Sequence, residues 1–244
     1  MAIPMYGKTF NLQSPNKRLQ VAVVSGESLT WSILHDSKEV MRQSQIDINN
    51  AYQGKASASA VKNHKISFAT PFYRQKSVTT EYNELTLSLG KGWSVVFRAF
   101  DEGVAYRFQC KGKVPAIISD EKAEFHFNGD CQSWLSFTTN DKKPEAMAFQ
   151  NIYDQKPLGE AKDKLAFLPA TVANGSVKLT ILESDLRAYP GMFVKKSADG
   201  ESLEGWFARY PKTFDKYPWR QQRYVTSTED FIARTNGKLF QTPW

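Results

Sequence analysis

The sequence has no long apolar stretch. No run of residues approaches the ~18 apolar positions that a membrane-spanning helix needs, and the mean hydropathy is −0.48. A transmembrane protein is therefore excluded. The first seven residues also lack the basic and apolar regions of a signal peptide. The protein is then either cytoplasmic or has lost a signal peptide.

Cysteine and histidine are scarce. Cys110 and Cys131 are the two cysteines, and they form no C-x-x-C motif. We favour two unpaired core thiols, and a disulfide between them stays open. The three histidines, His35, His64 and His126, lie far apart and in no metalloprotease motif. No nucleophile elbow, P-loop or dinucleotide-binding glycine motif occurs either, although a Ser-His-Asp triad stays open.

The charge is basic but scattered. There are 32 Lys and Arg against 25 Asp and Glu, a formal net charge of +7. No run reaches five like charges, and no zinc-finger, helix-turn-helix or RNA-binding pattern is present. The basic residues therefore indicate solvated faces, and we expect no nucleic-acid partner.

Apolar residues that alternate with polar ones dominate the chain. Hydrophobic residues make up 41% of it, enough to close a sizeable core. Their period of two is typical of antiparallel strands joined by tight turns, with helices few. The strands expected from this pattern include Glu124–Phe127, Gln132–Phe137, Leu165–Val172, Val177–Glu183, Gly191–Lys196 and Glu201–Phe207. The fold class predicted is all-β, a large antiparallel β-sandwich with few short helices.

We expect one domain over residues 1–244. The stretches Asn49–Asn63 and Thr138–Glu145 are typical of loops rather than of linkers. Thr226 and Glu229 form a candidate capping box ahead of a short helix. The aromatic ending, residues 240–244, suggests a chain cut just before another domain begins.

One carboxylate stands out by its phase. Val177, Leu179 and Ile181 occupy alternate positions, and Glu183 continues them. Alternation therefore directs Glu183 to the apolar side at the end of the strand, with Asp185 on the same side if the strand persists. Either the strand has ended and Glu183 is solvated, or its carboxylate is presented to a cation such as calcium or to a hydroxylated ligand.

The tryptophans are the other candidate binding residues. Trp134, Trp206 and Trp219 could stack on sugar rings, and core or interface packing is the alternative for each. Trp31 and Trp93 lie in alternating segments and are expected in the core. The segment Tyr217–Arg220 could cover a sheet or contact a partner domain.

Several segments together resemble one known family. Residues 97–108, FRAFDEGVAYRF, resemble the FRAYDDGVAFRY hairpin of glycoside hydrolase family 97. Residues 182–192, LESDLRAYPGM, are similar to its ITEADLxDYPGMY segment, with Leu182 where threonine is usual. Residues 12–21, 81–86 and 236–244 also match family segments, in order along nearly the whole chain.

The resemblance implies the N-terminal domain of an α-glucosidase or α-galactosidase secreted to the periplasm of Gram-negative bacteria. It implies a β-super-sandwich related to galactose mutarotase, followed after residue 244 by a catalytic (β/α)8 barrel. Glu183 matches the family residue that binds a calcium ion shared with the barrel. Asp185 and Trp134 are candidates for the substrate pocket.

The resemblance also implies that the catalytic carboxylates lie outside this chain, so the domain is not catalytic alone. Its expected partners are its own barrel and an α-linked oligosaccharide. The chain itself is then an accessory domain that shapes the active-site pocket. The alternative is a free-standing carbohydrate-binding or mutarotase-like β-sandwich protein.

Overall fold

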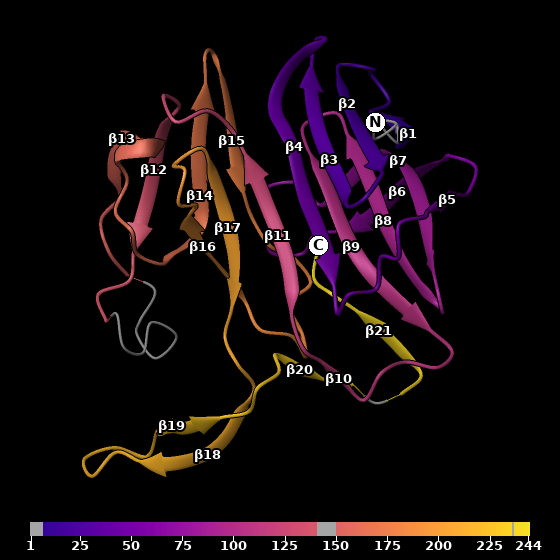
Figure 1. Cartoon of the computed structure of the whole chain (residues 1–244). Coiled ribbons are helices and arrows are strands. Elements are labelled where there is room, and N and C mark those ends of the chain that lie inside the picture. Colours follow the sequence, from indigo (N-terminus) through magenta and orange to yellow (C-terminus); the bar gives the residue numbers. More distant parts are fainter. Residues whose placement is uncertain (1–6, 141–149, 236) are drawn as a thin grey trace, which may run out of the picture.

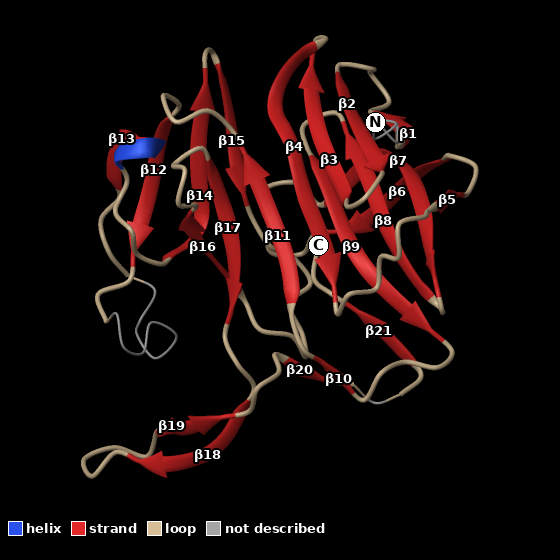
Figure 2. Cartoon of the chain, in the orientation of Figure 1, coloured by secondary structure: helices blue, strands red, loops and turns tan. Residues whose placement is uncertain are grey.

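The computed structural model describes residues 7–140, 150–235 and 237–244. Nearly all regular structure in these residues is β-strand, as Figure 2 shows, and their helical content is one short turn, η2 (Leu158–Glu160). The predicted all-β class is confirmed. None of the described segments forms a helix long and apolar enough to cross a bilayer.

Eleven of the described strands form one large sheet. Its order is β1-β2-β3-β4-β11-β17-β16-β14-β12-β13, with β15 paired to β14, and each pair is antiparallel. The bounds are β1 (Lys8–Gln13), β2 (Leu19–Ser25), β3 (Leu29–His35), β4 (Lys38–Ile48), β11 (Glu121–His126), β12 (Gln132–Phe137), β13 (Asp154–Pro157), β14 (Ala166–Asn174), β15 (Val177–Ile181), β16 (Met192–Lys196) and β17 (Ser202–Phe207).

A second sheet, the small sheet, has six strands. Its order is β21-β9-β8-β7-β5, with β6 also paired to β7. The bounds are β5 (Ser57–Ala58), β6 (Lys62–Ala69), β7 (Ser77–Gly90), β8 (Trp93–Phe100), β9 (Val104–Lys111) and β21 (Leu239–Gln241). Two short strands, β10 (Ile117–Ile118) and β20 (Ala233–Arg234), pair with each other beside it.

The core lies between the small sheet and the β1–β4 and β11 side of the large sheet (Figure 1), and it continues along the large sheet over β12, β14, β16 and β17. The sequence directs this packing, because every second residue of β2 is buried, Val21 and Val23 completely. On the facing strand β8, Val95 and Phe97 are also fully buried. Trp31 and Trp93 lie in this core as expected, at 4% and 6% exposure.

The turn from β7 to β8 requires glycine. Gly92 has φ +84°, and a Cβ added there would lie 2.3 Å from the carbonyl oxygen of Lys111. Any other residue would both strain the backbone and collide with β9.

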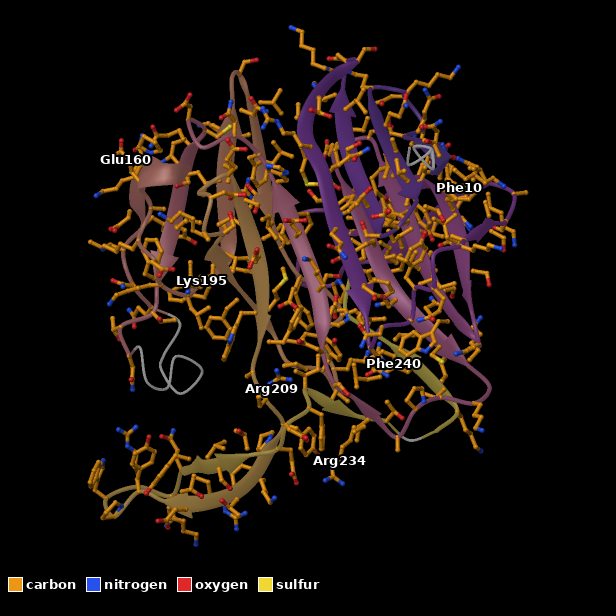
Figure 3. The ribbon with its side chains drawn as sticks, viewed as in Figure 1. Phe10, Glu160, Lys195, Arg209, Arg234 and Phe240 are labelled. Atoms are coloured by element: carbon orange, nitrogen blue, oxygen red, sulfur yellow. The ribbon has the colours of Figure 1, made fainter. Side chains whose placement is uncertain are left out.

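Strands β18 (Pro211–Lys216) and β19 (Arg223–Thr228) form a hairpin, the arm, that projects from the sandwich (Figure 1). Its base is fixed by Arg209, which donates hydrogen bonds to the carbonyls of Ser119 and Asp230 at 2.7 and 3.2 Å (Figure 3). Every residue of β18 is exposed, and Trp219, at the tip of the arm, is 72% exposed. Of the segment Tyr217–Arg220, Tyr217 packs on Tyr224 of β19, with the ring centroids 4.7 Å apart.

Several predictions about local structure were wrong. The candidate helix after Thr226 is absent, because Thr226 lies in β19 and bonds Thr213 across the hairpin instead of capping a helix. The expected loop Asn49–Asn63 contains β5 and the start of β6. By contrast, the loop predicted at Thr138–Glu145 agrees with its described part, which has no strand up to residue 140, and the rest lies outside the described residues.

The predicted strands are confirmed with shifts at their ends. Gln132–Phe137 matches β12. The strand predicted as Val177–Glu183 ends at Ile181, and the one predicted as Glu124–Phe127 begins earlier, at Glu121. Cys110 and Cys131 are both buried and free, so the favoured reading of two unpaired thiols is confirmed.

Candidate functional site

A cavity of about 830 Å³ opens where the edge of the small sheet meets the large sheet. Its apolar walls come from β3, β4, β9 and β11, with Trp31 and Tyr106 among them. Its rim includes the segment that joins β15 to β16, residues 182–191, which we call the rim segment. Five carboxylates line it: Asp101 and Glu102 in the turn from β8 to β9, Glu121 on β11, and Glu183 and Asp185 in the rim segment.

Glu183 lies in the rim segment and faces this cavity. Although β15 ends two residues earlier, the side chain keeps to the side of Ile181 and is half-buried. The backbone N–H of Met192 donates to its Oε2 at 3.0 Å. Burial raises the pKa of the Glu183 carboxyl, and the Met192 hydrogen bond opposes the rise. The carboxylate is thus held and desolvated, as alternation predicted.

Glu121 is a second inward carboxylate that the sequence analysis missed. It is the first residue of β11, and the hydroxyl of Tyr189 donates to its Oε2 at 2.5 Å. Burial raises the pKa of Glu121 to about 8, and the nearby Glu183 adds to the rise. The same burial, together with Glu121, raises the pKa of Tyr189. Burial therefore favours the neutral form of both groups.

A signal for Glu121 was present in the sequence. It shares the phase of Ala123, Phe125 and Phe127, all of which are buried. The alternation that singled out Glu183 therefore also applies to Glu121, once the strand is extended to its true start. No comparable local signal marks Tyr189. It comes close to Glu121 because of the path that the rim segment takes.

Asp185 is engaged by two arginines. Arg107 Nη2 donates to its Oδ2 at 2.8 Å, and Arg187 Nε donates to its Oδ1 at 2.7 Å. These hydrogen bonds, that of Arg107 first, lower the pKa of the Asp185 carboxyl. Its backbone is left-handed, with φ +62°, a strained state for a residue other than glycine. Asp185 therefore organises the rim segment, and both of its oxygens are already occupied.

Trp134 lies apart from these carboxylates. It is on β12, which pairs with β14, while Glu183 follows β15 on the other side of β14. Trp134 does not line the cavity, and Lys178 Nζ lies 5.1 Å from its ring centroid. The structure therefore brings Glu183 and Asp185 together and leaves Trp134 outside.

The described residues were also compared with the ligand set that a calcium ion needs. Within the described ranges, no three His, Cys, Asp or Glu residues come close enough to hold an ion. Glu183 has the donor chemistry that calcium prefers, but calcium takes 6–8 oxygen ligands. The residues present fit one ligand of a shared site, not the whole site.

The fold and this cavity define an antiparallel β-sandwich domain with a carboxylate-bearing rim at its open edge. The profile described as Glycosyl-hydrolase 97 N-terminal matches residues 12–236. The chain therefore belongs to the family of N-terminal domains of family 97 glycoside hydrolases, as the resemblance implied.

Known proteins similar to this chain are considerably longer. A retaining α-galactosidase of Bacteroides thetaiotaomicron is 32% identical over 251 residues, which cover 97% of this chain and 38% of that protein. A family 97 enzyme from Pseudoalteromonas sp. strain K8 matches the fold with TM-score 0.70 and 20% identity, over 96% of this chain and 34% of its own. A β-arabinopyranosidase matches with TM-score 0.73 and 18% identity, over 96% and 39%. The chain thus spans about two fifths or less of these relatives.

Proposed function

We propose that this chain is the accessory domain of an enzyme that hydrolyses α-glycosidic bonds, and that its rim segment shapes the active-site pocket. Membership of the family carries the proposal, because the relatives that match nearly all of this chain extend well beyond it. Between α-glucosides and α-galactosides, the retaining α-galactosidase at 32% identity favours α-galactosides.

The catalytic carboxylates belong to a following barrel domain in this proposal. Glycoside hydrolysis generally uses two carboxyl groups that flank the scissile bond. In the cavity described here, Glu121 is bonded to Tyr189 and Asp185 to two arginines. Both are engaged by partners within this chain, and in this proposal the chain supplies support while the barrel supplies the chemistry. We also propose that the enzyme acts in the periplasm.

Glu183 is the residue that reaches toward the barrel. Its carboxylate, held by the Met192 N–H and desolvated at the cavity rim, would be one oxygen ligand of a calcium ion. When bound, calcium supplies a positive charge that attracts sugar hydroxyls and stabilises negative charge. This chain would hold one calcium ligand, the Glu183 carboxylate, in a fixed position at the cavity rim and would limit the access of water to it.

The test compares Glu183→Gln with wild type in the full-length protein. We would measure hydrolysis of p-nitrophenyl α-galactoside and α-glucoside with added calcium and with a chelator. We expect wild type to prefer the galactoside and to lose activity with the chelator. We expect Glu183→Gln to lose about 100-fold in rate, and its calcium response with it, since losing even an outer-sphere partner of a metal costs about 10–100-fold.

Glu160→Gln is the matched control. Glu160 is exposed in the turn η2 and does not line the cavity (Figure 3). The same loss of one carboxylate should leave rate and calcium response unchanged there. Undiminished activity of Glu183→Gln would refute the calcium role of this residue, and no hydrolysis of either substrate by wild type would refute the substrate class.

The cavity supports a second candidate, a free-standing sugar-binding or mutarotase-like protein. A volume of about 830 Å³ lies within the range of small-molecule sites. This candidate predicts that the 244-residue chain alone binds galactose or accelerates its mutarotation. This candidate would be refuted if calorimetric titration with galactose gave no heat and galactose mutarotation ran at the uncatalysed rate.

A further inference from the structure

The rim segment is fastened to the small sheet immediately after Glu183. Ser184 exchanges two backbone hydrogen bonds with Trp244, one from Ser184 N at 3.0 Å and one from Trp244 N at 2.9 Å. The next residue, Asp185, receives the 2.8 Å hydrogen bond from Arg107 on β9. The contacts of Ser184 and Asp185, the two residues after Glu183, therefore fix the position of the backbone next to Glu183.

Trp244 is itself held by two cations of the small sheet. The guanidinium carbon of Arg98 lies 4.0 Å from its ring centroid and that of Arg107 lies 4.2 Å away. Arg98 on β8 is oriented by Glu84 on β7, whose Oε2 accepts from its Nε at 2.8 Å. Arg107 thus takes part in both sets of contacts, since it bonds Asp185 and stacks on Trp244.

Stability alone does not account for Arg107. Its side chain is 7% exposed, and its Nε has no hydrogen-bond partner among the described residues. A buried charge with an unpaired donor is costly, and an apolar residue of similar volume would often serve stability as well or better. What an apolar residue could not do is hold the left-handed Asp185 and orient the Trp244 ring.

We propose that Arg107 is a positioning residue that fixes the Glu183 carboxylate by clamping Asp185 and Trp244 against the small sheet. The positioning follows from contacts within this chain, whereas its consequence for a metal ion rests on the function proposed above. Because Trp244 is part of the clamp, the same arginine also ties the last residue of the sequence to the cavity rim.

The first measurement is hydrogen–deuterium exchange of the rim segment in the full-length protein. We expect Arg107→Met to speed exchange across residues 182–190 by about 10-fold or more, because local opening loses the buried contacts that oppose it. Arg187→Met is the matched control: it removes an arginine from the same carboxylate, but one that is 83% exposed. Exposed ion pairs contribute little, so its exchange should change by about 2-fold or less.

The second measurement is the apparent calcium affinity of the same variants. Residues that orient a metal ligand typically change affinity by 10–100-fold, so we expect Arg107→Met to weaken calcium binding by about 10-fold or more. Arg107→Lys keeps the charge but loses the planar fork and the ring stacking, so its affinity should lie between those of Arg107→Met and wild type. Arg187→Met should match wild type.

Wild-type exchange of residues 182–190 in a folded Arg107→Met would overturn the positioning role. Wild type that binds no calcium would refute the metal function instead, and the exchange result would still decide the clamp. If Arg107→Met does not fold, Asp185→Asn takes its place: asparagine tolerates the left-handed backbone and removes the charge that Arg107 binds. Fast exchange in Asp185→Asn supports the clamp, and unchanged exchange refutes it.

Discussion

The two faces of the small sheet have opposite characters. On the inner face Phe97 and Phe108 are fully buried against the large sheet. On the outer face their neighbours in the same strands, Arg98 and Arg107, stack on Trp244. One sheet thus carries apolar side chains on one face and charged side chains on the other, from adjacent positions in each strand.

The difference shows how one sheet can serve stability and positioning. Burial on the inner face is non-directional and scales with apolar area. The contacts of the outer face are directional, and through Arg107 they reach Asp185, two residues from Glu183. Substitutions on the inner face should therefore change the free energy of unfolding most, and those on the outer face should change the rim segment more than the global stability.

The largest effect on stability is expected from Phe97→Ala. It removes a fully buried ring that contacts Trp31 and Tyr106, and such truncations cost about 3–5 kcal/mol. Urea denaturation of the 244-residue chain measures the loss. Phe97→Leu, which refills much of the space, should lose clearly less. A loss below about 1 kcal/mol for Phe97→Ala would show that this face is not the core that the structure describes.

The next effect is a pH dependence from Glu121. Its pKa is about 8 in the folded chain, whereas an unfolded chain releases this proton near pH ~4.3. The folded state therefore binds more protons between these values, and the free energy of unfolding falls as pH rises through the window. We expect the free energy of unfolding to fall by about 2–4 kcal/mol between pH 5 and pH 8. This range is set below what the full pKa shift implies, because the carboxyl borders an open cavity.

Glu121→Gln isolates this contribution. The amide oxygen can still accept the Tyr189 hydroxyl, but no proton is gained or lost. Denaturation midpoints of the variant should vary less with pH than those of wild type. Identical pH profiles for the two proteins would show that Glu121 is not the group responsible.

A smaller effect is expected from Arg98→Met on the outer face. The pair with Glu84 is part-buried, at 28% and 20% exposure, so its loss should cost about 1 kcal/mol. Arg18→Met removes the exposed pair with Asp36, at 58% and 50% exposure, and should change stability less. If Arg98→Met cost as much as Phe97→Ala, the distinction between the two faces would fail.

The smallest effect is expected in the arm, where no second sheet covers either face. Trp219 is 72% exposed at the tip, and its ring centroid lies 5.7 Å from that of Tyr217. Trp219→Ala should shift the free energy of unfolding of this chain by about 0.5 kcal/mol or less. A larger loss would reveal packing of the arm that the structure does not contain.

Local pattern predicted the sandwich well and the arm poorly. Strands such as β2 and β12 are recognisable because one face of each is buried, which forces polar and apolar residues to alternate. No residue of β18 or β19 is fully buried, so burial imposes no alternation on the arm. Thr226 then resembled a helix cap, although its hydroxyl bonds Thr213 in the neighbouring strand.

The sequence by itself determined that the chain is an all-β sandwich, and its alternation directed Glu183 to the apolar side while leaving open whether the carboxylate is solvated. Both follow from the two-residue period of a strand, which is a local property. Only the tertiary structure decided that Tyr189 bonds Glu121 and that Arg107 bonds Asp185, because the partners lie 68 and 78 residues apart. No periodicity encodes such pairings; they arise when the two sheets pack and carry the rim segment across the edge of the cavity.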